Sequence, residues 1–172
     1  MGTLWHTARR VAGYVADVTV LAIVLVPIAS LVSVALGTEG LAGLDVWLRS
    51  LVMISIPAWT YFVVTEHRWG AGVGKRLLGL RTVAVGTEAP PTLGAAFVRT
   101  AVTLAPWELI HLAFFGLAPA LGEVTASQIV VAAIAYLLVA AYVVVTLWTG
   151  GRRSPADLAA ATEVRRREPA PA

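Results

Sequence analysis

Residues 68–85 read Arg-Trp-Gly-Ala-Gly-Val-Gly-Lys-Arg-Leu-Leu-Gly-Leu-Arg-Thr-Val-Ala-Val, a basic and glycine-rich stretch with apolar runs of membrane length on both sides. The glycines and Lys75 invite comparison with a phosphate-binding loop. That loop requires a glycine where Trp69 stands and a serine or threonine where Arg76 stands, after a strand that the sequence does not predict. The stretch therefore predicts a connector at a membrane surface, with glycines that permit tight turns, and not a nucleotide site.

The composition of the chain places it among membrane proteins. Of its 172 residues, 58% are hydrophobic and 13% are charged, and the mean hydropathy is +0.80. Soluble domains carry about 25% charged residues, so this chain has too few polar groups to cover a soluble fold. The lack of cysteine excludes disulfides, thiolate catalysis and cysteine-based metal sites.

Apolar segments predict an all-α membrane fold with four transmembrane helices, in a single domain that covers residues 1–167. The helices are expected at about residues 11–36, 45–65, 92–117 and 127–148. Each is long enough to cross a hydrocarbon core of about 30 Å. Thr92 is the expected N-cap of the third helix, and Pro106 is the expected position of a kink. Residues 168–172 are predicted to be a disordered tail.

The distribution of charge predicts the orientation of these helices. Twelve of the 13 Lys and Arg residues lie in or beside the N-terminal segment, the connector at residues 66–91 and the C-terminal tail. The two hairpin loops carry Glu39 and Glu123 instead. Since positive residues favour the cytoplasmic side, both termini and the connector are expected in the cytoplasm. Arg49 is the exception, and it lies within the second predicted helix.

An internal repeat relates the two halves of the chain. Shifting the sequence by 81 residues aligns residues 61–85 with residues 142–166, with seven identities over 25 positions. The alignment predicts two copies of a two-helix hairpin, whose axis of pseudo-symmetry lies along the membrane normal. It also predicts short cytoplasmic strands at residues 80–85 and 161–166 that pair with each other. Arg76 and Asp157 occupy matching positions, and we expect them to form an ion pair.

The same connector and its surroundings resemble the RDD family of bacterial membrane proteins, which is named for one arginine and two aspartates. An arginine opens the first helix, an aspartate follows seven residues later, and the connector contains Gly-Lys-Arg-Leu-Leu-Gly-Leu-Arg. The residues that carry the resemblance are Arg10, Asp17, Gly74, Lys75, Arg76, Gly79, Arg99 and Asp157. The resemblance covers nearly the whole chain. It implies a multi-pass protein of the bacterial cytoplasmic, or inner, membrane, and transport is the activity commonly suggested for the family.

Asp17 lies within the first predicted span, where a carboxylate is costly. Seven residues correspond to nearly two helical turns, so Asp17 shares the helix face of Arg10. It is expected to face the bundle and to have a partner, since a carboxylate in hydrocarbon costs about 2.5–3.5 kcal/mol. Two interpretations remain open: a cation or proton site, or a buried structural pair with an arginine such as Arg99.

A second group of ionisable residues lies in the third predicted span. Glu108 and His111 are spaced i,i+3 and share a helix face, and Arg49 on the second span is expected at a similar depth. The group would form a proton relay, because histidine titrates near neutral pH. The alternative is an interhelical salt bridge and a hydrogen bond that fix the packing.

The sequence shows no arrangement typical of an enzyme. The histidines lie in separate segments without the spacing of a metal site, and no serine has the surroundings of a catalytic nucleophile. We expect no enzymatic activity, no cofactor and no bound metal. Lys75, Arg76 and Arg81 are expected to contact anionic lipid headgroups in the bilayer, and no nucleic-acid partner is expected.

The sequence therefore leaves two hypotheses of different classes. The first is transport of an ion or small solute, with proton-coupled cation movement through Asp17, Glu108, His111 and Arg49. Four helices are few for a transport path, so a homodimer is expected. The second is a non-transporting membrane scaffold or accessory subunit, which binds a partner protein or anionic lipid through its basic cytoplasmic face.

Overall fold

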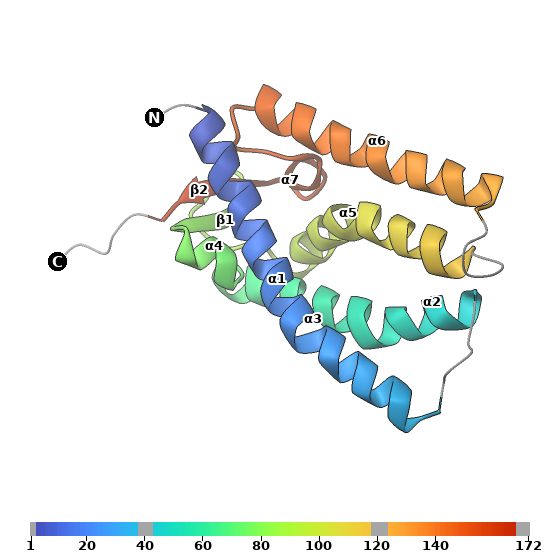
Figure 1. Cartoon of the computed structure of the whole chain (residues 1–172). Helices are drawn as coiled ribbons and strands as arrows, with labels where there is room; N and C mark the ends of the chain where they lie inside the picture. Colours follow the sequence, from blue (N-terminus) through green and yellow to red (C-terminus); the bar gives the residue numbers. More distant parts are fainter. Residues whose placement is uncertain (1–2, 38–42, 118–123, 168–172) are drawn as a thin grey trace.

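The computed structural model describes residues 3–37, 43–117 and 124–167, and its main elements are four long helical segments (Figure 1). The segments consist of α1 (Thr3–Ala35); α2 (Leu44–Ser50), η1 (Leu51–Ser55) and α3 (Ile56–Trp69); α5 (Leu93–His111) and η2 (Leu112–Gly116); and α6 (Ala126–Trp148). All four are long and apolar enough to cross a membrane. The four predicted spans are confirmed. The predicted acidic loops with Glu39 and Glu123, and the predicted tail at residues 168–172, lie outside the described residues.

The first helix is longer than the sequence predicts. It begins at Thr3, whereas the apolar pattern begins at residue 11. The additional turns are held by polar partners from the C-terminal part of the chain: the ring of His6 hydrogen-bonds the carbonyl of Val164, and Arg10 donates to the carbonyl of Gly151. Hydropathy alone does not reveal such partners.

Two of the four segments contain a turn of π-helix, in which the hydrogen bond reaches five residues back instead of four. These turns are η1 and η2, in the second and third segments. The helix α5 starts at the expected N-cap, because the side chain of Thr92 accepts a hydrogen bond from the backbone N–H of Ala95. It continues helically through Pro106, and the departure from α-helical geometry follows later, in η2.

The connector and the C-terminal segment pair in a small antiparallel sheet. Each strand follows a one-turn helix: α4 (Val73–Leu77) precedes β1 (Leu80–Ala84), and α7 (Pro155–Ala159) precedes β2 (Thr162–Arg166). Thr82 stands opposite Val164 in the register. The predicted pairing of the two segments is confirmed, while the internal repeat stays a prediction. We call this end of the bundle, with α4, α7 and both strands, the sheet end.

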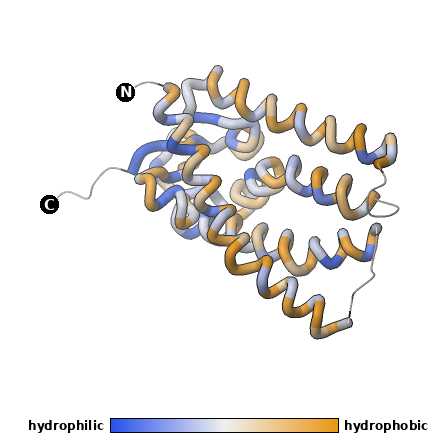
Figure 2. The backbone as a smooth tube through the Cα atoms, viewed as in Figure 1, coloured by the Kyte–Doolittle hydropathy of each residue, from blue (hydrophilic) through white to orange (hydrophobic). Residues whose placement is uncertain are grey.

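Most of the large side chains that are fully buried lie at the sheet end. Leu80, Val83 and Val164 are at most 1% exposed, and so are the polar Thr82 and Thr162. Figure 2 shows hydrophilic backbone concentrated at the sheet end, whereas the long helices are mostly apolar along their length. The packed core of the protein is therefore partly polar and lies where the helices meet the sheet.

Close backbone contact joins α1 to α4. A Cβ atom on Gly74 would lie 2.2 Å from the carbonyl oxygen of Gly13 and 2.9 Å from the backbone nitrogen of Asp17. Real Cβ atoms do not approach a backbone atom that closely, so the two helices could not pack at this distance with a larger residue at position 74. Away from this contact, α1 diverges from α2 toward the opposite end of the bundle (Figure 1).

We predict that Gly74→Ala destabilises the protein by about 1–3 kcal/mol, the usual range for overpacking a close contact. The matched control is Gly94→Ala, because a Cβ there meets nothing within 4 Å, and alanine favours a helix over glycine by about 1 kcal/mol. The measurement is the midpoint of thermal unfolding in detergent. Equal midpoints for the two variants would contradict the close contact.

Candidate functional site

A buried network of charges joins five elements at the sheet end. Arg99 of α5 lies at its centre: its Nε donates to Asp157 Oδ1 at 2.9 Å, and its Nη1 pairs with the carboxylate of Glu66. Lys75 of α4 pairs with the same Glu66, and Arg10 of α1 donates to Asp157 Oδ2 at 2.6 Å. We call these five residues the charge cluster. It holds three cations and two carboxylates, and none of the five side chains is more than 11% exposed.

Asp157 is further held by its own short helix. In α7, the hydroxyl of Ser154 and the backbone N–H of Ser154 both donate to Asp157 Oδ2, and the hydroxyl of Thr162 donates to Oδ1. Burial alone would raise the pKa of the Asp157 carboxyl, but Arg99 and Arg10 outweigh it and hold this pKa well below its usual range. The charged form of Asp157 is therefore strongly favoured in the folded protein.

Lys75 is a member of the cluster and not a surface residue. Its side chain is 9% exposed. Burial and the neighbouring charge of Arg99 lower the pKa of Lys75, and Glu66 offsets part of that shift. The prediction that Lys75 contacts lipid headgroups is therefore wrong, because its ammonium group points into the protein and pairs with Glu66. The prediction for Arg76 and Arg81 stays open, and Arg81 also pairs with Glu88 at the surface.

Asp17 is a helix cap in this structure. Its Oδ1 accepts hydrogen bonds from the hydroxyl of Tyr61 at 2.5 Å and from the backbone N–H of Gly74 at 2.9 Å. The Tyr61 hydroxyl in turn accepts from the N–H of Val73 at 2.8 Å. The first N–H groups of α4 thus find partners on other helices, since the N-cap residue Gly72 has no side chain to offer. A Cβ on Gly72 would lie 2.6 Å from Asp17 Oδ1.

One predicted ion pair is wrong, and of the two interpretations left open for Asp17 the pair with Arg99 is not formed. Asp17 does not pair with Arg99, because Arg99 is taken up by Glu66 and Asp157. Arg76 does not pair with Asp157, because both oxygens of that carboxylate are paired with Arg10 and Arg99. The guanidinium of Arg76 instead stacks on the ring of Trp69, 4.4 Å from its centroid.

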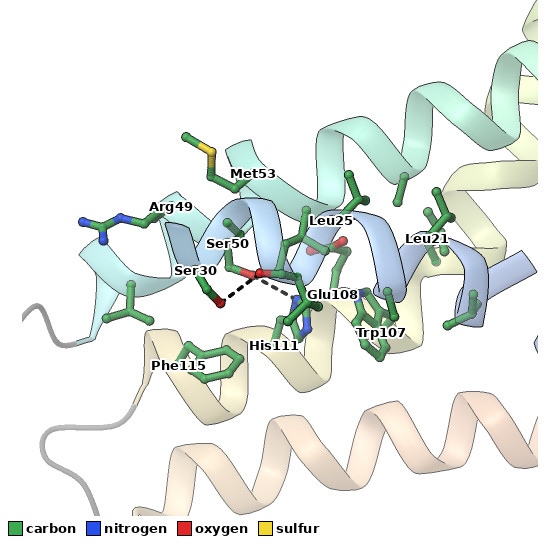
Figure 3. A pocket seen from close by; sticks show the side chains of 18 of the residues that line it. Leu21, Leu25, Ser30, Arg49, Ser50, Met53, Trp107, Glu108, His111 and Phe115 are labelled. Carbon is green, nitrogen blue, oxygen red and sulfur yellow. Dashed lines mark hydrogen bonds between the residues drawn. The ribbon is translucent and has the colours of Figure 1, made fainter. Parts of the chain in front are cut away.

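A large cavity lies among the membrane-spanning segments (Figure 3). Its volume is about 650 Å³, and its walls come from α1, α2, η1, α3, α5 and η2. Most of the lining is aliphatic or aromatic. The polar side chains in its wall include Ser30, Arg49, Ser50, Glu108 and His111. The structure therefore brings Glu108 and His111 to one cavity, as their spacing predicts.

Glu108 is the unusual residue of this cavity. Both of its carboxylate oxygens are buried, and neither has a hydrogen-bond partner among the described residues. His111 Nδ1 lies 3.4 Å from the hydroxyl of Ser50, and its ring packs between Trp107 and Phe115. Figure 3 shows the guanidinium of Arg49 directed away from Glu108. The expected salt bridge from Arg49 to Glu108 is thus not formed.

A second cavity, of about 490 Å³, reaches Glu108 from another side. It is bordered by α3 and η1, and Ser55 and Trp59 are in its wall. The hydroxyl of Ser55, the last residue of η1, is also buried without a hydrogen-bond partner among the described residues. The Glu108 side chain therefore stands in the partition between two cavities, next to a π-helical turn.

Comparison with known protein families identifies the chain. Residues 5–161 match the model of the RDD family, which is most of the sequence. The chain belongs to the RDD family. Neither the curated proteins nor the solved structures that were compared include a match.

The residues by which this RDD protein resembles its family converge at the sheet end. Arg10, Lys75, Arg99 and Asp157 are members of the charge cluster, Asp17 caps α4, and Gly74 allows α1 to approach α4. Gly79, with φ +63°, forms the turn between α4 and β1. The family motif of this chain thus builds one folded unit around the ends of the helices.

Sequence reasoning missed the residue that joins two cations of the cluster. Glu66 is 1% exposed and pairs with both Lys75 and Arg99. One signal was available in the RDD sequence, because Glu66 is the one acidic residue between Asp45 and Glu88, in a segment whose other charged side chains are basic. A carboxylate in such surroundings is expected to neutralise a neighbouring cation.

We predict that Glu66→Gln destabilises the protein by about 3–5 kcal/mol, because Lys75 and Arg99 then share a buried site without their common counter-charge. The matched control is Glu88→Gln. That carboxylate is 61% exposed and pairs with Arg81 and Arg165, so its loss should cost at most about 1 kcal/mol. Thermal unfolding in detergent and the amount of folded protein in the membrane measure both variants.

We also predict that acid weakens the fold through Asp157. Its pKa is lowered in the folded state, so the stability that it contributes is complete above the unfolded pKa of about 3.9 and is lost as pH falls through the folded pKa. Thermal midpoints measured from neutral pH down to pH about 3 should therefore fall more steeply for the wild type than for Asp157→Asn. Parallel curves would contradict the role given to this carboxylate.

Proposed function

We propose that this RDD protein moves an ion or small solute across the membrane through the large cavity, and that the carboxylate of Glu108 binds the charge that moves. The observation that carries the proposal is the buried, unpartnered state of both Glu108 oxygens in the cavity wall. The proposed role is transport and not catalysis.

The cost of burying an ionised carboxylate supports this proposal. Buried polar groups nearly always have hydrogen-bond partners, and a charge at membrane depth is costly, so such residues mark pathways for ions and solutes. Glu108 relieves that cost by taking up either a proton or a cation. The two species then exclude each other, which is the basis for proton-coupled movement of a cation. His111, one turn away with its Nδ1 near Ser50, is positioned to pass the proton.

The position of Glu108 between two cavities supports access from more than one direction. The larger cavity lies among α1, α2, α3 and α5, and the smaller lies along α3 and η1. Both π-helical turns are near, η1 ending at Ser55 and η2 beginning at Leu112. Such turns are frequent at functional sites.

The charge distribution supports a location in the bacterial cytoplasmic membrane with the sheet end in the cytoplasm. The sheet end holds the basic residues of the N-terminal segment, the connector and the C-terminal segment, and positive residues favour the cytoplasmic side. Large apolar side chains on α1 and α6, such as Leu31 and Leu137, are about 70% exposed in the single chain. These faces suit lipid or a second copy, and we propose a homodimer.

A second candidate function is a membrane scaffold or accessory subunit. It is favoured by the arginines that the sheet end exposes: Arg68, Arg76, Arg152, Arg166 and Arg167. Together these side chains form a basic surface that suits anionic lipid headgroups or an acidic partner protein. Under this hypothesis the charge cluster provides a rigid base for that surface, and the cavity has no role.

We predict that Glu108→Gln abolishes transport without loss of stability. In proteoliposomes with an internal pH-sensitive dye, cations added one at a time should drive proton movement in the wild type and in Glu88→Gln, but not in Glu108→Gln. The thermal midpoint of Glu108→Gln should equal or exceed that of the wild type, because an uncompensated buried charge is removed. Full flux in Glu108→Gln would contradict the proposal. No flux with any cation, together with specific co-purification of a partner, would favour the scaffold.

A further inference from the structure

We infer that the large cavity binds a lipophilic organic cation, a molecule with one positive charge among apolar groups, whose charge pairs with Glu108. The inference rests on the proposed function and names the class of solute for the same site. The inference adds the chemical class of the solute to the proposed transport. Inorganic ions and organic cations can be distinguished because they require different side chains in a binding site.

The size and lining of the cavity favour an organic molecule. A volume of about 650 Å³ lies within the range of about 300–1,000 Å³ typical of pockets for drug-sized ligands. The wall consists largely of aliphatic side chains, including Val18, Leu21, Leu25, Met53 and Ile54. A small hydrated ion would find few partners in such a wall, whereas apolar substituents would bury their surface against it.

The charge of the cavity favours a cation. Glu108 is the one carboxylate among the described residues that line it, and its oxygens are buried without hydrogen-bond partners. The other charged side chain in the wall, Arg49, extends away from Glu108 (Figure 3). His111 lies beside Ser50. The negative charge of Glu108 is therefore available to a ligand within an apolar space.

Aromatic side chains at several heights of the cavity strengthen this preference. Tyr14, Phe62, Trp107 and Phe115 all contribute to the wall, and Trp107 precedes Glu108 in the chain. The faces of aromatic rings attract cations that have shed their water, and organic ammonium groups are recognised in this way. One carboxylate surrounded by aromatic and aliphatic groups matches a diffuse organic charge.

The same wall suits an inorganic cation poorly. Hard metal ions take about six or more oxygen ligands. The side-chain oxygens that line the cavity are the hydroxyls of Tyr14, Ser30, Ser33 and Ser50 and the carboxylate of Glu108, and the described residues contain no group of three His, Asp or Glu side chains that could hold a metal. The oxygens near Glu108 are thus too few for a metal ion without its water.

The arrangement of the helices suggests how such a molecule enters. α1 contacts α4 at the sheet end and then diverges from α2 toward the other end (Figure 1). The cavity lies along α1 from Tyr14, beside that contact, to Ser33 in the diverging part. A lipophilic cation concentrated in the bilayer therefore reaches the cavity from the lipid, without first crossing the polar sheet end.

The test is equilibrium binding of tetraphenylphosphonium to the purified protein in nanodiscs, with empty nanodiscs subtracted and triphenylphosphine oxide as the neutral comparison. We expect saturable binding of the cation by the wild type and Glu88→Gln, and binding weaker by roughly tenfold or more in Glu108→Gln. The neutral compound should not distinguish Glu108→Gln from the wild type. Thermal unfolding of each variant verifies that it is folded.

Three outcomes would overturn the inference. They are no saturable binding by the wild type, equal binding by Glu108→Gln, and displacement of the bound cation by excess Na⁺ but not by excess choline at the same ionic strength. Equal binding would indicate an apolar pocket for a lipid chain, and displacement by Na⁺ would indicate a metal-ion site. Loss of flux in Glu108→Gln without cation binding leaves the proposed transport standing and removes this solute class. Binding of the cation without flux would support this solute class and contradict the proposed transport.

Discussion

The fold depends on the guanidinium group of Arg99, which is buried between two carboxylates that come from distant parts of the chain. A buried guanidinium cannot shed its charge, so it must be paired. Glu66 lies on α3 and Asp157 on α7. Each of these carboxylates pairs with one further cation: Glu66 with Lys75 of α4, and Asp157 with Arg10 of α1. The two carboxylates thus hold the ends of α1, α3 and α5 together with the short helices α4 and α7 at the sheet end.

The protein therefore contains buried charge of two kinds. At the sheet end both carboxylates of the charge cluster are paired with cations, and Asp157 also accepts hydrogen bonds from two hydroxyls. In the membrane-spanning part Glu108 has no hydrogen-bond partner among the described residues. Satisfied networks give rigidity, whereas an unsatisfied buried charge needs something from outside to complete it. This contrast separates the charge cluster from Glu108, to which we assign function.

The sequence predicted the four spans and the strand pairing well, because apolar length and charge placement are properties of the chain itself. It could not predict which ions pair. The repeat placed Arg76 beside Asp157, whereas Arg10 is one of its partners in the structure; that pairing depends on the distance between α1 and α7, which no local pattern encodes. The π-helical turns and the direction of Arg49 are likewise set by packing between helices. Glu66 escaped notice because a glutamate at a helix end looks like an ordinary surface residue.

One consequence concerns the biosynthesis of the protein. Asp157 and β2 follow all four membrane-spanning segments in the chain, so the ribosome makes Arg10 and Arg99 well before the carboxylate that they share. Until residues 151–166 emerge, Glu66 is the sole carboxylate of the cluster, and it faces three cations. The ion pairs that Asp157 makes with Arg10 and Arg99 can therefore form only after all four membrane-spanning segments have been made.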